Sequence, residues 1–557
     1  MAEGWEVVIL GAGINGAGLF RDLCAQGVNC LLVDKGDFGS GTSAAPSRLI
    51  HGGLKYLETG EFRLVAQSTL ERNLLLKNAP HLVAPLETVI PIFSWTRGVT
   101  AALRTLLGNT RTPRSRGALL IKIGLSLYDH YGARERVMPR HRMLSRRRML
   151  EELPQLTPRI TAAGAYYDAR ITAPERLVLE LVQDGLAANP ASAARSYARL
   201  TDIRGGRLTF QGADGQSFAA TPRIVINATG PWIDTVNASL GTPTRLIGGT
   251  RGSHILLDHP RLVQALAGRM LYFEADDGRI LLAYDYLGRA LIGSTDIKDS
   301  DPDRVRCDED EIAYFLTSLR ALLPGFQFDE RQIVYAYSGI RPLPASDAAT
   351  PGLISRDHSA PVTEAAAGRP FPVISLVGGK WTTFRGFAEE VADDVLARLG
   401  RLRQVSTRAL PIGGGKDFPA DSHARLAWIA AVAGTTGTAT ERVDQLFARY
   451  GTTARDILLH HAEYSDRATL PDAESHTRAE IDWIVRHERV TTLADILMRR
   501  TTLAITGNLS QADIADIADI AASALGWDMA RKTQEIRDAT EQLTTTHRLR
   551  LRLPPLG

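Results

Sequence analysis

The chain contains few cysteines and no apolar run long enough to cross a membrane. Cys24, Cys30 and Cys307 fit neither a metal-ligand spacing nor a disulfide framework. We therefore expect no metal site and a reducing, cytoplasmic compartment. No uninterrupted apolar run reaches the roughly 20 residues that a spanning helix needs. The first apolar run begins almost at the N-terminus, so we also expect no cleavable signal peptide.

The net charge is only +3, but it is unevenly distributed. Between Arg97 and Arg148 there are thirteen Lys and Arg residues and only two acidic ones, with apolar stretches between them. Such a segment can lie on an anionic membrane surface. The same composition also fits a solvated loop and, less well, a nucleic-acid partner. We expect peripheral binding to the inner face of the cell membrane through residues 97–148, and no nucleic-acid partner.

A chain of 557 residues is too long for one compact core, so two or three domains are expected. The glycine-rich stretch 413–415 is typical of a linker, and helical patterns follow it. We therefore place a first region at residues 1–408 and a helical C-terminal domain at residues 409–557.

The most informative pattern is an apolar run that stops at Gly11, Gly13 and Gly16, spaced Gly-x-Gly-x-x-Gly. A second apolar run follows and stops at Asp34. This order is that of a strand, a tight turn, a helix, a second strand and an acidic residue. It predicts a dinucleotide-binding unit, in which the Asp34 carboxylate accepts hydrogen bonds from ribose hydroxyls. A glycine-rich turn in an unrelated α/β protein is the alternative.

Four polar clusters follow this motif, at residues 40–57, at 251–254, at 338–342 with 355–358 shortly after, and at 378–385. Any one of them is unremarkable, because a single His or Arg is more often structural. Together they resemble the FAD-dependent, quinone-linked glycerol-3-phosphate dehydrogenases, from Val7 to about Leu525. The most specific segments are 11–18, 49–57, 227–232, 251–254, 293–296, 338–343 and 378–384. The C-terminal segments 486–488 and 498–501 also look like that family.

The resemblance implies an α/β fold with three parts. These are a doubly wound, Rossmann-like FAD-binding domain, a β-rich substrate domain inserted mainly at about 240–335, and an all-helical C-terminal domain. It also implies a homodimer. The residues expected to hold FAD by similarity are Gly11, Gly13, Asn15, Gly16, Asp34, Thr42, Ser43, Ser47, His51, Gly52, Gly53, Gly230, Gly379, Lys380, Thr382 and Thr383.

The implied reaction is oxidation of sn-glycerol 3-phosphate to dihydroxyacetone phosphate, with hydride transfer to flavin N5 and electrons passed to quinone. A phosphate dianion needs several fixed cations. The resemblance assigns substrate binding to Lys55, Tyr56, His254, Arg341, Arg356 and Lys380. Among these we expect His254, Arg341 and Lys55 to act in catalysis. His254 would accept the C2 hydroxyl proton, or Arg341 would stabilise the alkoxide.

Two positions depart from the family. Lys55 stands where Arg is usual, which keeps the charge but loses the planar fork. This departure leaves open a related substrate such as erythritol phosphate. The segment 172–176 lacks the acidic pair that the family shows before its Arg. Other interpretations are an oxygen-using glycerol-phosphate oxidase, an amine oxidase of the wider flavin superfamily, and a flavin-binding sensor without catalysis.

Overall fold

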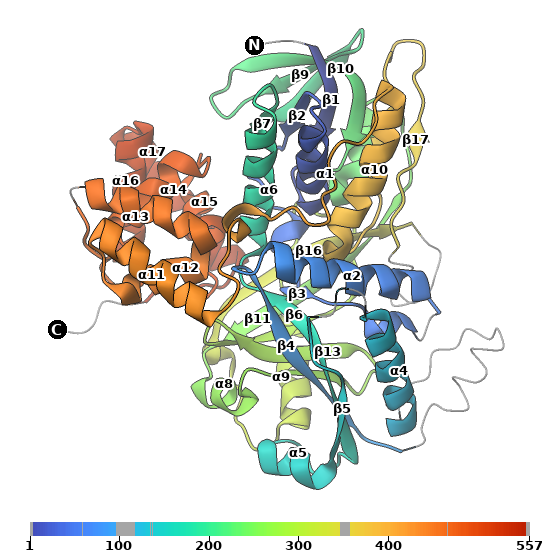
Figure 1. Cartoon of the computed structure of the whole chain (residues 1–557), viewed down its shortest axis with the longest axis vertical. Helices are drawn as coiled ribbons and strands as arrows, with labels where there is room; N and C mark the ends of the chain where they lie inside the picture. Colours follow the sequence, from blue (N-terminus) through green and yellow to red (C-terminus); the bar gives the residue numbers. More distant parts are fainter. Residues whose placement is uncertain are drawn as a thin grey trace.

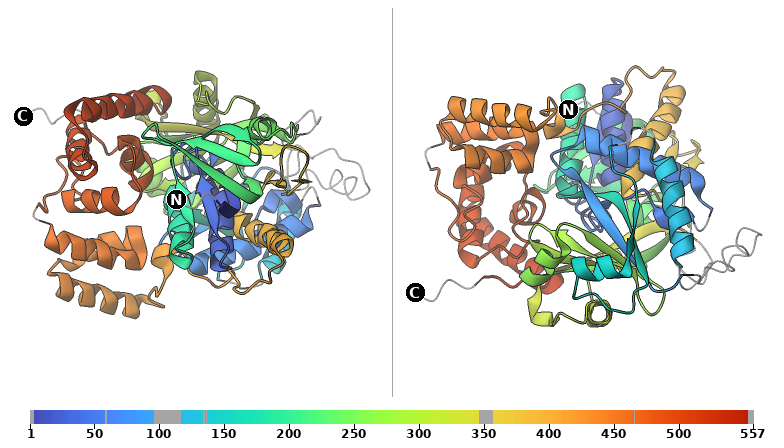
Figure 2. Two further views of the ribbon diagram at one scale, coloured as in Figure 1. Left: turned by 90° about the horizontal axis from the view of Figure 1, so that it is seen from above. Right: turned by 60° about the horizontal axis from the view of Figure 1, so that its bottom comes forward.

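The structure is a computed structural model. It describes residues 4–57, 60–95, 117–133, 135, 137–345, 357–464 and 466–552. The fold contains two sheets. In the view of Figure 1 one lies in the upper part and the other in the lower part, and a helical domain lies beside both of them (Figures 1 and 2). Residues 97–116 of the basic segment 97–148 lie outside the described residues. The described remainder of the segment contains α4 (Ala118–Tyr131), β5 (Arg142–Ser145) and the start of α5 (Arg146–Glu152).

The first sheet has the strand order β17-β18-β10-β1-β2-β7, and β1, β2, β7, β10 and β18 run parallel. An antiparallel hairpin of β8 and β9 extends from β10. The strands are β1 (Gly4–Leu10), β2 (Cys30–Val33), β7 (Ala193–Arg195), β8 (Arg199–Arg204), β9 (Arg207–Gln211), β10 (Ser217–Asn227), β17 (Val362–Thr363) and β18 (Val373–Ser375).

Both faces of this sheet are covered, as the continuous apolar runs predict. Val7 and Ile9 of β1 pack toward the helices, while Val8 and Leu10 pack toward the β8–β9 hairpin. The helices beside this sheet are α1 (Ile14–Ala25), α6 (Pro174–Ala188), α7 (Ile233–Ser239) and α10 (Phe384–Leu399). Figure 1 shows α1, α6 and α10 side by side.

The second sheet has the order β15-β11-β14-β13-β12-β4-β6-β3, with β16 paired to β11 and β5 paired to β6. It therefore also takes strands from residues 49–171, outside the stretch 240–335 predicted for the substrate domain. The strands are β3 (Leu49–Ile50), β4 (Val83–Ile92), β5 (Arg142–Ser145), β6 (Ala162–Ile171), β11 (Ile247–Leu257), β12 (Met270–Glu274), β13 (Ile280–Tyr286), β14 (Arg289–Gly293), β15 (Ile297–Lys298) and β16 (Ile333–Pro344).

One face of the second sheet packs against α5, α8 and α9, and the other against the C-terminal domain. Helices α2 and α4 lie together at one end of this sheet (Figure 1). Their bounds are α2 (Phe62–Asn78), α4 (Ala118–Tyr131), α5 (Arg146–Glu152), α8 (Pro260–Leu266) and α9 (Glu309–Leu322).

The described part of the C-terminal domain is helical, as the sequence predicts. Its helices are α11 (Ser422–Thr436), α12 (Thr440–Tyr450), α13 (Ala454–Glu463), α14 (Arg478–His487), α15 (Leu493–Asp495), α16 (Gln511–Leu525) and α17 (Met529–Glu541). A π-helical turn, η9 (Ile496–Arg500), continues α15. Gly414 and Gly415, expected in a linker, are buried in a 3-10 turn that packs against Tyr450 and Asn78.

Helix α1 lies very close to the turn that precedes it. Gly11 adopts a φ of +97°, which an L side chain rarely takes. A Cβ atom on Gly16 would lie 1.9 Å from the carbonyl oxygen of Gly11. The third glycine of the motif is therefore required by packing between helix and strand.

We expect Gly16→Ala to destabilise the chain, because the added methyl group cannot fit without moving the turn. Overpacking of this kind costs about 1–3 kcal/mol. The thermal unfolding midpoint of the cofactor-free chain should therefore fall by several degrees. Gly434→Ala is the control, because this exposed glycine inside α11 has nothing within 4 Å of an added Cβ. There the midpoint should stay or rise, since Gly disfavours helix interiors. Equal midpoints for the two variants would contradict the packing argument.

Candidate active site

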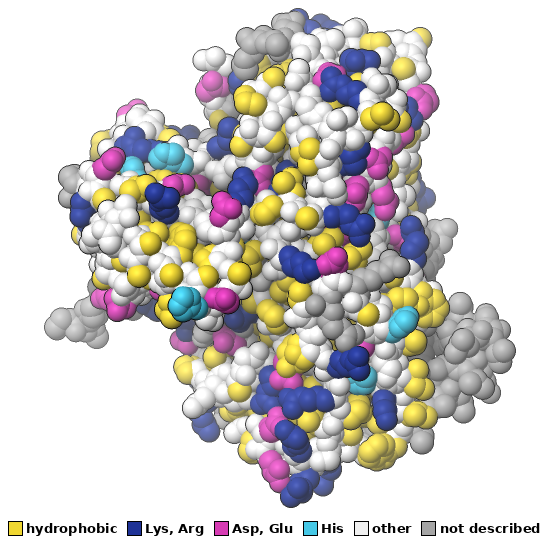
Figure 3. Space-filling model, in the orientation of Figure 1, with side chains coloured by type: hydrophobic (Ala, Val, Ile, Leu, Met, Phe, Trp, Pro, Cys, Tyr) yellow, Lys and Arg dark blue, Asp and Glu magenta, His cyan; other side chains and the backbone are white. Residues whose placement is uncertain are grey.

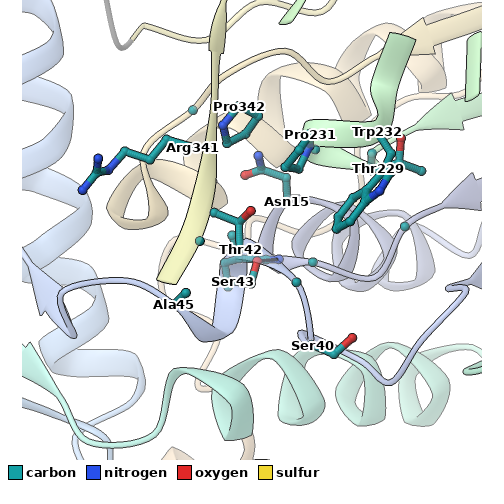
Figure 4. A pocket seen from close by; sticks show the side chains of 18 of the residues that line it. Asn15, Ser40, Thr42, Ser43, Ala45, Thr229, Pro231, Trp232, Arg341 and Pro342 are labelled. Carbon is teal, nitrogen blue, oxygen red and sulfur yellow. Dashed lines mark hydrogen bonds between the residues drawn. The ribbon is translucent and has the colours of Figure 1, made fainter. Parts of the chain in front are cut away.

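A cavity of about 680 Å³ lies where the carboxyl ends of β1, β2 and β10 face β11 and β16. Ligands in open α/β sheets bind outside the carboxyl ends of the strands. Asn15, Thr42 and Ser43 lie near the centre of Figure 4, with Trp232 to one side and Arg341 to the other. The cavity is therefore lined by both sheets, and it is roomy enough for a large ligand.

At the end of β2, Asp34 is tied to the glycine-rich turn. Its carboxylate accepts hydrogen bonds from the backbone N–H groups of Ala12 (2.6 Å) and Gly36 (2.9 Å). Burial is the largest influence on this group and raises the pKa of Asp34 to about 6. Each carboxylate oxygen has a second lone pair, so the group can also accept from hydroxyls in the cavity.

The start of α1 presents polar groups to the cavity. The N–H of Ile14 donates to Ser43 Oγ at 2.9 Å, which fixes the loop after β2 against the helix. The side chain of Asn15 donates to the carbonyl of Gly378 at 3.3 Å. Its Oδ1 is buried with no hydrogen-bond partner among the described residues. An orphaned acceptor in a cavity wall is suited to a ligand that donates a hydrogen bond.

Lys35, Trp232 and Asp303 form a contact at one end of the cavity, and all three line it. Lys35 Nζ lies 4.0 Å from the centroid of the Trp232 ring and 2.9 Å from an Asp303 oxygen. The indole N–H of Trp232 donates to the same oxygen at 3.1 Å. This contact joins the loops after β2 and β10 to the loop after β15.

Lys380 lies at the start of η6 (Trp381–Thr383), which leads into α10. Its ammonium group is buried, 3.1 Å from Ser68 Oγ and 4.1 Å from the centroid of the Tyr56 ring. The N–H of Thr383 donates to the Lys380 carbonyl at 3.1 Å. A buried cation at a helix N-terminus makes this wall of the cavity favourable for negative charge.

His254, on β11, is buried and uncharged. Burial, and after it the positive charges of Arg341 and Arg48, hold the pKa of His254 well below its usual range. Its Nε2 lies 2.8 Å from Ser47 Oγ, and its ring stacks on Tyr337 with centroids 4.8 Å apart. Nδ1 has no hydrogen-bond partner among the described residues. The neutral ring can therefore accept a proton.

Arg341, on β16, reaches across β11 into the cavity. Its guanidinium donates to the Thr295 carbonyl (3.0 Å), Ser294 Oγ (3.0 Å) and Asp296 Oδ1 (3.2 Å). A Cβ on Gly252 would lie 2.0 Å from Arg341 Nη2, so only glycine leaves room for this fork. Asp296 balances part of its charge and fixes its orientation.

The cavity brings together most of the site residues expected from the sequence. Those that line it are Gly11, Gly13, Asn15, Asp34, Thr42, Ser43, Ser47, His51, Tyr56, Gly230, His254, Arg341, Gly379, Lys380 and Thr382. The expected residues that are not among the lining are Gly16, Gly52, Gly53, Lys55 and Thr383. Lys55 is next to Tyr56 on the 3-10 turn η2 (Leu54–Leu57). Arg356 lies outside the described residues.

Sequence reasoning missed several residues that shape the site. Lys35 follows Asp34 directly, and Trp232 belongs to a segment already singled out, so both positions carried a signal. Asp296 also lies in a singled-out segment. Ser68, inside α2, had no signal, because nothing local predicts that it meets Lys380 across 312 residues of sequence.

Comparisons with known proteins identify the family of the chain. The family described as "FAD dependent oxidoreductase" matches residues 6–392, and the "C-terminal domain of alpha-glycerophosphate oxidase" matches residues 405–532. The chain is 34% identical to a glycerol-3-phosphate dehydrogenase of Synechocystis sp., over 97% of this chain and 96% of the relative. It is 29% identical to the D-erythritol 1-phosphate dehydrogenase of Brucella abortus, over 90% and 94%.

The crystal structure of the glycerol-3-phosphate dehydrogenase from Bacillus halodurans complexed with FAD is similar in fold. Its TM-score is 0.76 at 21% identity, covering 98% of this chain and 95% of that one. The expected α/β FAD-binding fold with a helical C-terminal domain is therefore confirmed. Among the described residues, no helix combines the length and apolar character needed to span a bilayer.

We expect FAD binding to weaken several-fold as the pH falls from 7.5 to 5. Asp34 is ionised above its raised pKa of about 6, and a carboxylate accepts from hydroxyls more strongly than the neutral acid that forms below it. Fluorescence titration of the cofactor-free chain with FAD across this range is the measurement. Asp34→Asn should bind weakly with little change over the same range. A pH dependence shared equally by both chains would rule out Asp34 as its source.

Proposed function

Because the chain belongs to the family of FAD-dependent oxidoreductases, we propose that it oxidises sn-glycerol 3-phosphate to dihydroxyacetone phosphate and passes the electrons to quinone. One observation carries the proposal: the cations Arg341 and Lys380 and the neutral His254 line one cavity with the glycine-rich turn. A polyol phosphate requires cations for its phosphate and a proton acceptor for its alcohol.

The residues of the cavity fit FAD. The turn at Gly11 and Gly13 has no side chains to block a pyrophosphate, and Asp34 has lone pairs for ribose hydroxyls. Asn15 Oδ1 needs a donor, which an isoalloxazine or adenine N–H group can supply. When bound, FAD supplies the two-electron acceptor, flavin N5, for the hydride from C2. Lys380 and the start of α10 offer positive potential to the reduced ring.

We assign the phosphate to Arg341 and Lys380, which both line the cavity, while Lys55, which is not among the lining residues, stays a prediction for this role. Arg341 offers a planar fork, while Lys380 offers a compact charge fixed by Ser68 and Tyr56. Arg356 remains a prediction for the same role. Lys380 is buried, so its attraction for a dianion is screened less than that of a surface lysine.

His254 is the proposed acceptor for the C2 hydroxyl proton. Its lowered pKa keeps the ring unprotonated at neutral pH, ready to accept. The same environment destabilises the imidazolium that forms when the ring accepts a proton, so other groups must stabilise the products of this proton transfer. Arg341 can stabilise the developing alkoxide, and Ser47 Oγ, 2.8 Å from Nε2, can share the proton.

A four-carbon polyol phosphate is the second candidate substrate. The observation in its favour is Lys55, which stands where the dehydrogenase family usually has Arg. A lysine binds a phosphate with less directional hydrogen bonds than an arginine, which is compatible with a substrate that has a longer carbon chain. The match to the C-terminal domain of alpha-glycerophosphate oxidase likewise keeps oxygen as an alternative electron acceptor. The homodimer implied by the resemblance stays a prediction.

An exposed apolar stripe supports the proposed membrane contact. Leu119, Ile123 and Leu127 are spaced four residues apart on α4, and they are 52%, 51% and 40% exposed. Trp95 is 61% exposed at the start of the basic segment. Figure 3 shows apolar side chains at the edge where α4 lies, with basic side chains gathered over β5 and α5 nearby. An apolar stripe beside basic residues is typical of an interfacial helix.

Anaerobic addition of substrate tests the reaction. We expect glycerol 3-phosphate to bleach the flavin absorbance fastest, with erythritol phosphate in parallel. Arg341→Lys should lower kcat/KM about 100-fold or more, because the fork is lost where charge develops. Arg251→Lys, on β11 outside the cavity lining, is the control and should retain activity. Faster bleaching by erythritol phosphate would favour the second candidate, and no bleaching by either would reject both.

Sedimentation with anionic vesicles tests the membrane contact. Replacing Leu119, Ile123 and Leu127 with serine should weaken binding at least tenfold, since each buried apolar side chain contributes about 1.5 kcal/mol or more. The control replaces three apolar residues outside α4 that are more exposed than those of the stripe, Leu402 (82%), Leu426 (66%) and Met529 (69%). That chain should bind vesicles like the unchanged one. Similar losses in both would indicate nonspecific adhesion.

A further inference from the structure

The loop after β2 forms one wall of the FAD cavity. Its residues that line the cavity are Asp34, Lys35, Gly36, Ser40, Gly41, Thr42 and Ser43. Asp37, in the middle of this loop, is absent from the lining and is 1% exposed. Its carboxylate instead faces the C-terminal domain. The loop after β2 therefore contacts the cavity on one side and, through Asp37, the C-terminal domain on the other. That domain has no assigned role.

Asp37 is held by two consecutive arginines of η9. Arg500 makes a two-pronged contact, with Nη1 and Nη2 each 2.8 Å from a different carboxylate oxygen. Arg499 Nε lies 2.5 Å from one of the same oxygens. All three residues are buried, and the two guanidinium groups lower the pKa of Asp37 to about 2 despite that burial. Two-pronged, buried ion pairs fix orientation as well as distance.

A second cavity of about 530 Å³ lies between the loop and the C-terminal domain, and it shares Gly36, Ser40, Gly41 and Ala45 with the first. The loop is therefore a thin wall with a cavity on each side. Phe38, buried in the core of the first sheet, and the Gly39 N–H, which donates to the Ala12 carbonyl at 2.9 Å, hold the loop on one side. The ion pair of Asp37 with Arg499 and Arg500 holds it on the side of the C-terminal domain.

A second connection runs in parallel. The N–H of Tyr197 donates to the Gly36 carbonyl at 2.9 Å, and its hydroxyl donates to Asp495 at 2.5 Å. Arg499 Nη2 contacts the same Asp495 oxygen at 2.6 Å. Both connections therefore end on the short segment formed by α15 and η9.

We infer that Arg499 and Arg500 are positioning residues for the cofactor: through Asp37 they hold the loop at residues 34–43 in the shape that accepts FAD. A loop already ordered loses less conformational freedom on binding, so affinity rises without any new contact to the ligand. The C-terminal domain then acts in cofactor retention. This inference rests on FAD as the cofactor of the family, but it does not depend on which substrate the protein oxidises.

The chain contains a matched ion pair that should not have this effect. Arg176, on α6, contacts Glu488 of the C-terminal domain at 2.6 and 3.0 Å, and both residues are buried. Neither residue lines the FAD cavity. The pair also meets Arg500 through backbone groups, because Arg176 Nη2 donates to the Arg500 carbonyl at 2.9 Å and Arg500 Nε donates to the Glu488 carbonyl at 3.0 Å. Glu488→Gln keeps both carbonyls and the contact of Arg500 with Asp37, so it weakens the same domain interface without changing a group that touches the loop.

The test is titration of the full-length, cofactor-free chain with FAD, followed by flavin fluorescence, with no polyol phosphate present. Asp37→Asn should raise the Kd for FAD tenfold or more. Arg500→Lys, which keeps the charge but loses the fork, should raise it about threefold and speed FAD release. Glu488→Gln should stay within twofold of the unchanged chain. Thermal unfolding of each cofactor-free chain verifies folding, and Arg500→Lys decides if Asp37→Asn does not fold.

Two results would overturn the inference. One is an unchanged Kd in the folded Asp37→Asn and Arg500→Lys chains. The other is a rise in Kd for Glu488→Gln as large as that for Asp37→Asn, which would assign the effect to domain docking in general. Because substrate is absent, neither result bears on which alcohol the protein oxidises.

Discussion

The contact between α1 and the turn at Gly11 is the constraint on which the rest of the site depends. With 1.9 Å between a Gly16 Cβ position and the Gly11 carbonyl, the helix can begin only directly above the end of β1. Its first N–H groups therefore open into the cavity, beside Asp34 at the end of β2. The loop after β2 must then pass over this helix start, where Ser43 accepts from Ile14. The end of β1, the start of α1 and the loop after β2 therefore meet at one place, where a dinucleotide can bind.

The second sheet supplies what the first cannot. Parallel strands with a glycine-rich turn supply the backbone N–H groups and the Asp34 carboxylate on the dinucleotide side of the cavity. Strands β11 and β16 pair along eleven positions and deliver His254 and Arg341 to the same cavity. Burial then acts in opposite directions on the two walls. It raises the pKa of Asp34 and lowers that of His254, which brings both toward their less charged forms.

The sequence could predict the elements whose signal is local. The glycine-rich turn, Asp34 and the start of α10 each lie beside a short pattern with a physical meaning, and the cavity contains them. Partners far apart in sequence could not be predicted: Asp37 and Arg500 are 463 residues apart, and Ser47 and His254 are 207 apart. The segment 498–501 was noticed by resemblance, but its partner was not.

The departure at residues 172–176 acquires a physical meaning in the fold. Pro174 begins α6, and Glu175 accepts both prongs of the buried Arg48 at 2.6 and 3.2 Å. Arg48 is one of the two cations that lower the pKa of His254. A carboxylate paired with Arg48 offsets part of that influence, since the field of a neutralised cation falls off faster than that of a bare one. Glu175 therefore acts on the proposed proton acceptor without approaching the substrate. Through its contact with Arg48, α6 therefore contributes to the balance of charge around His254.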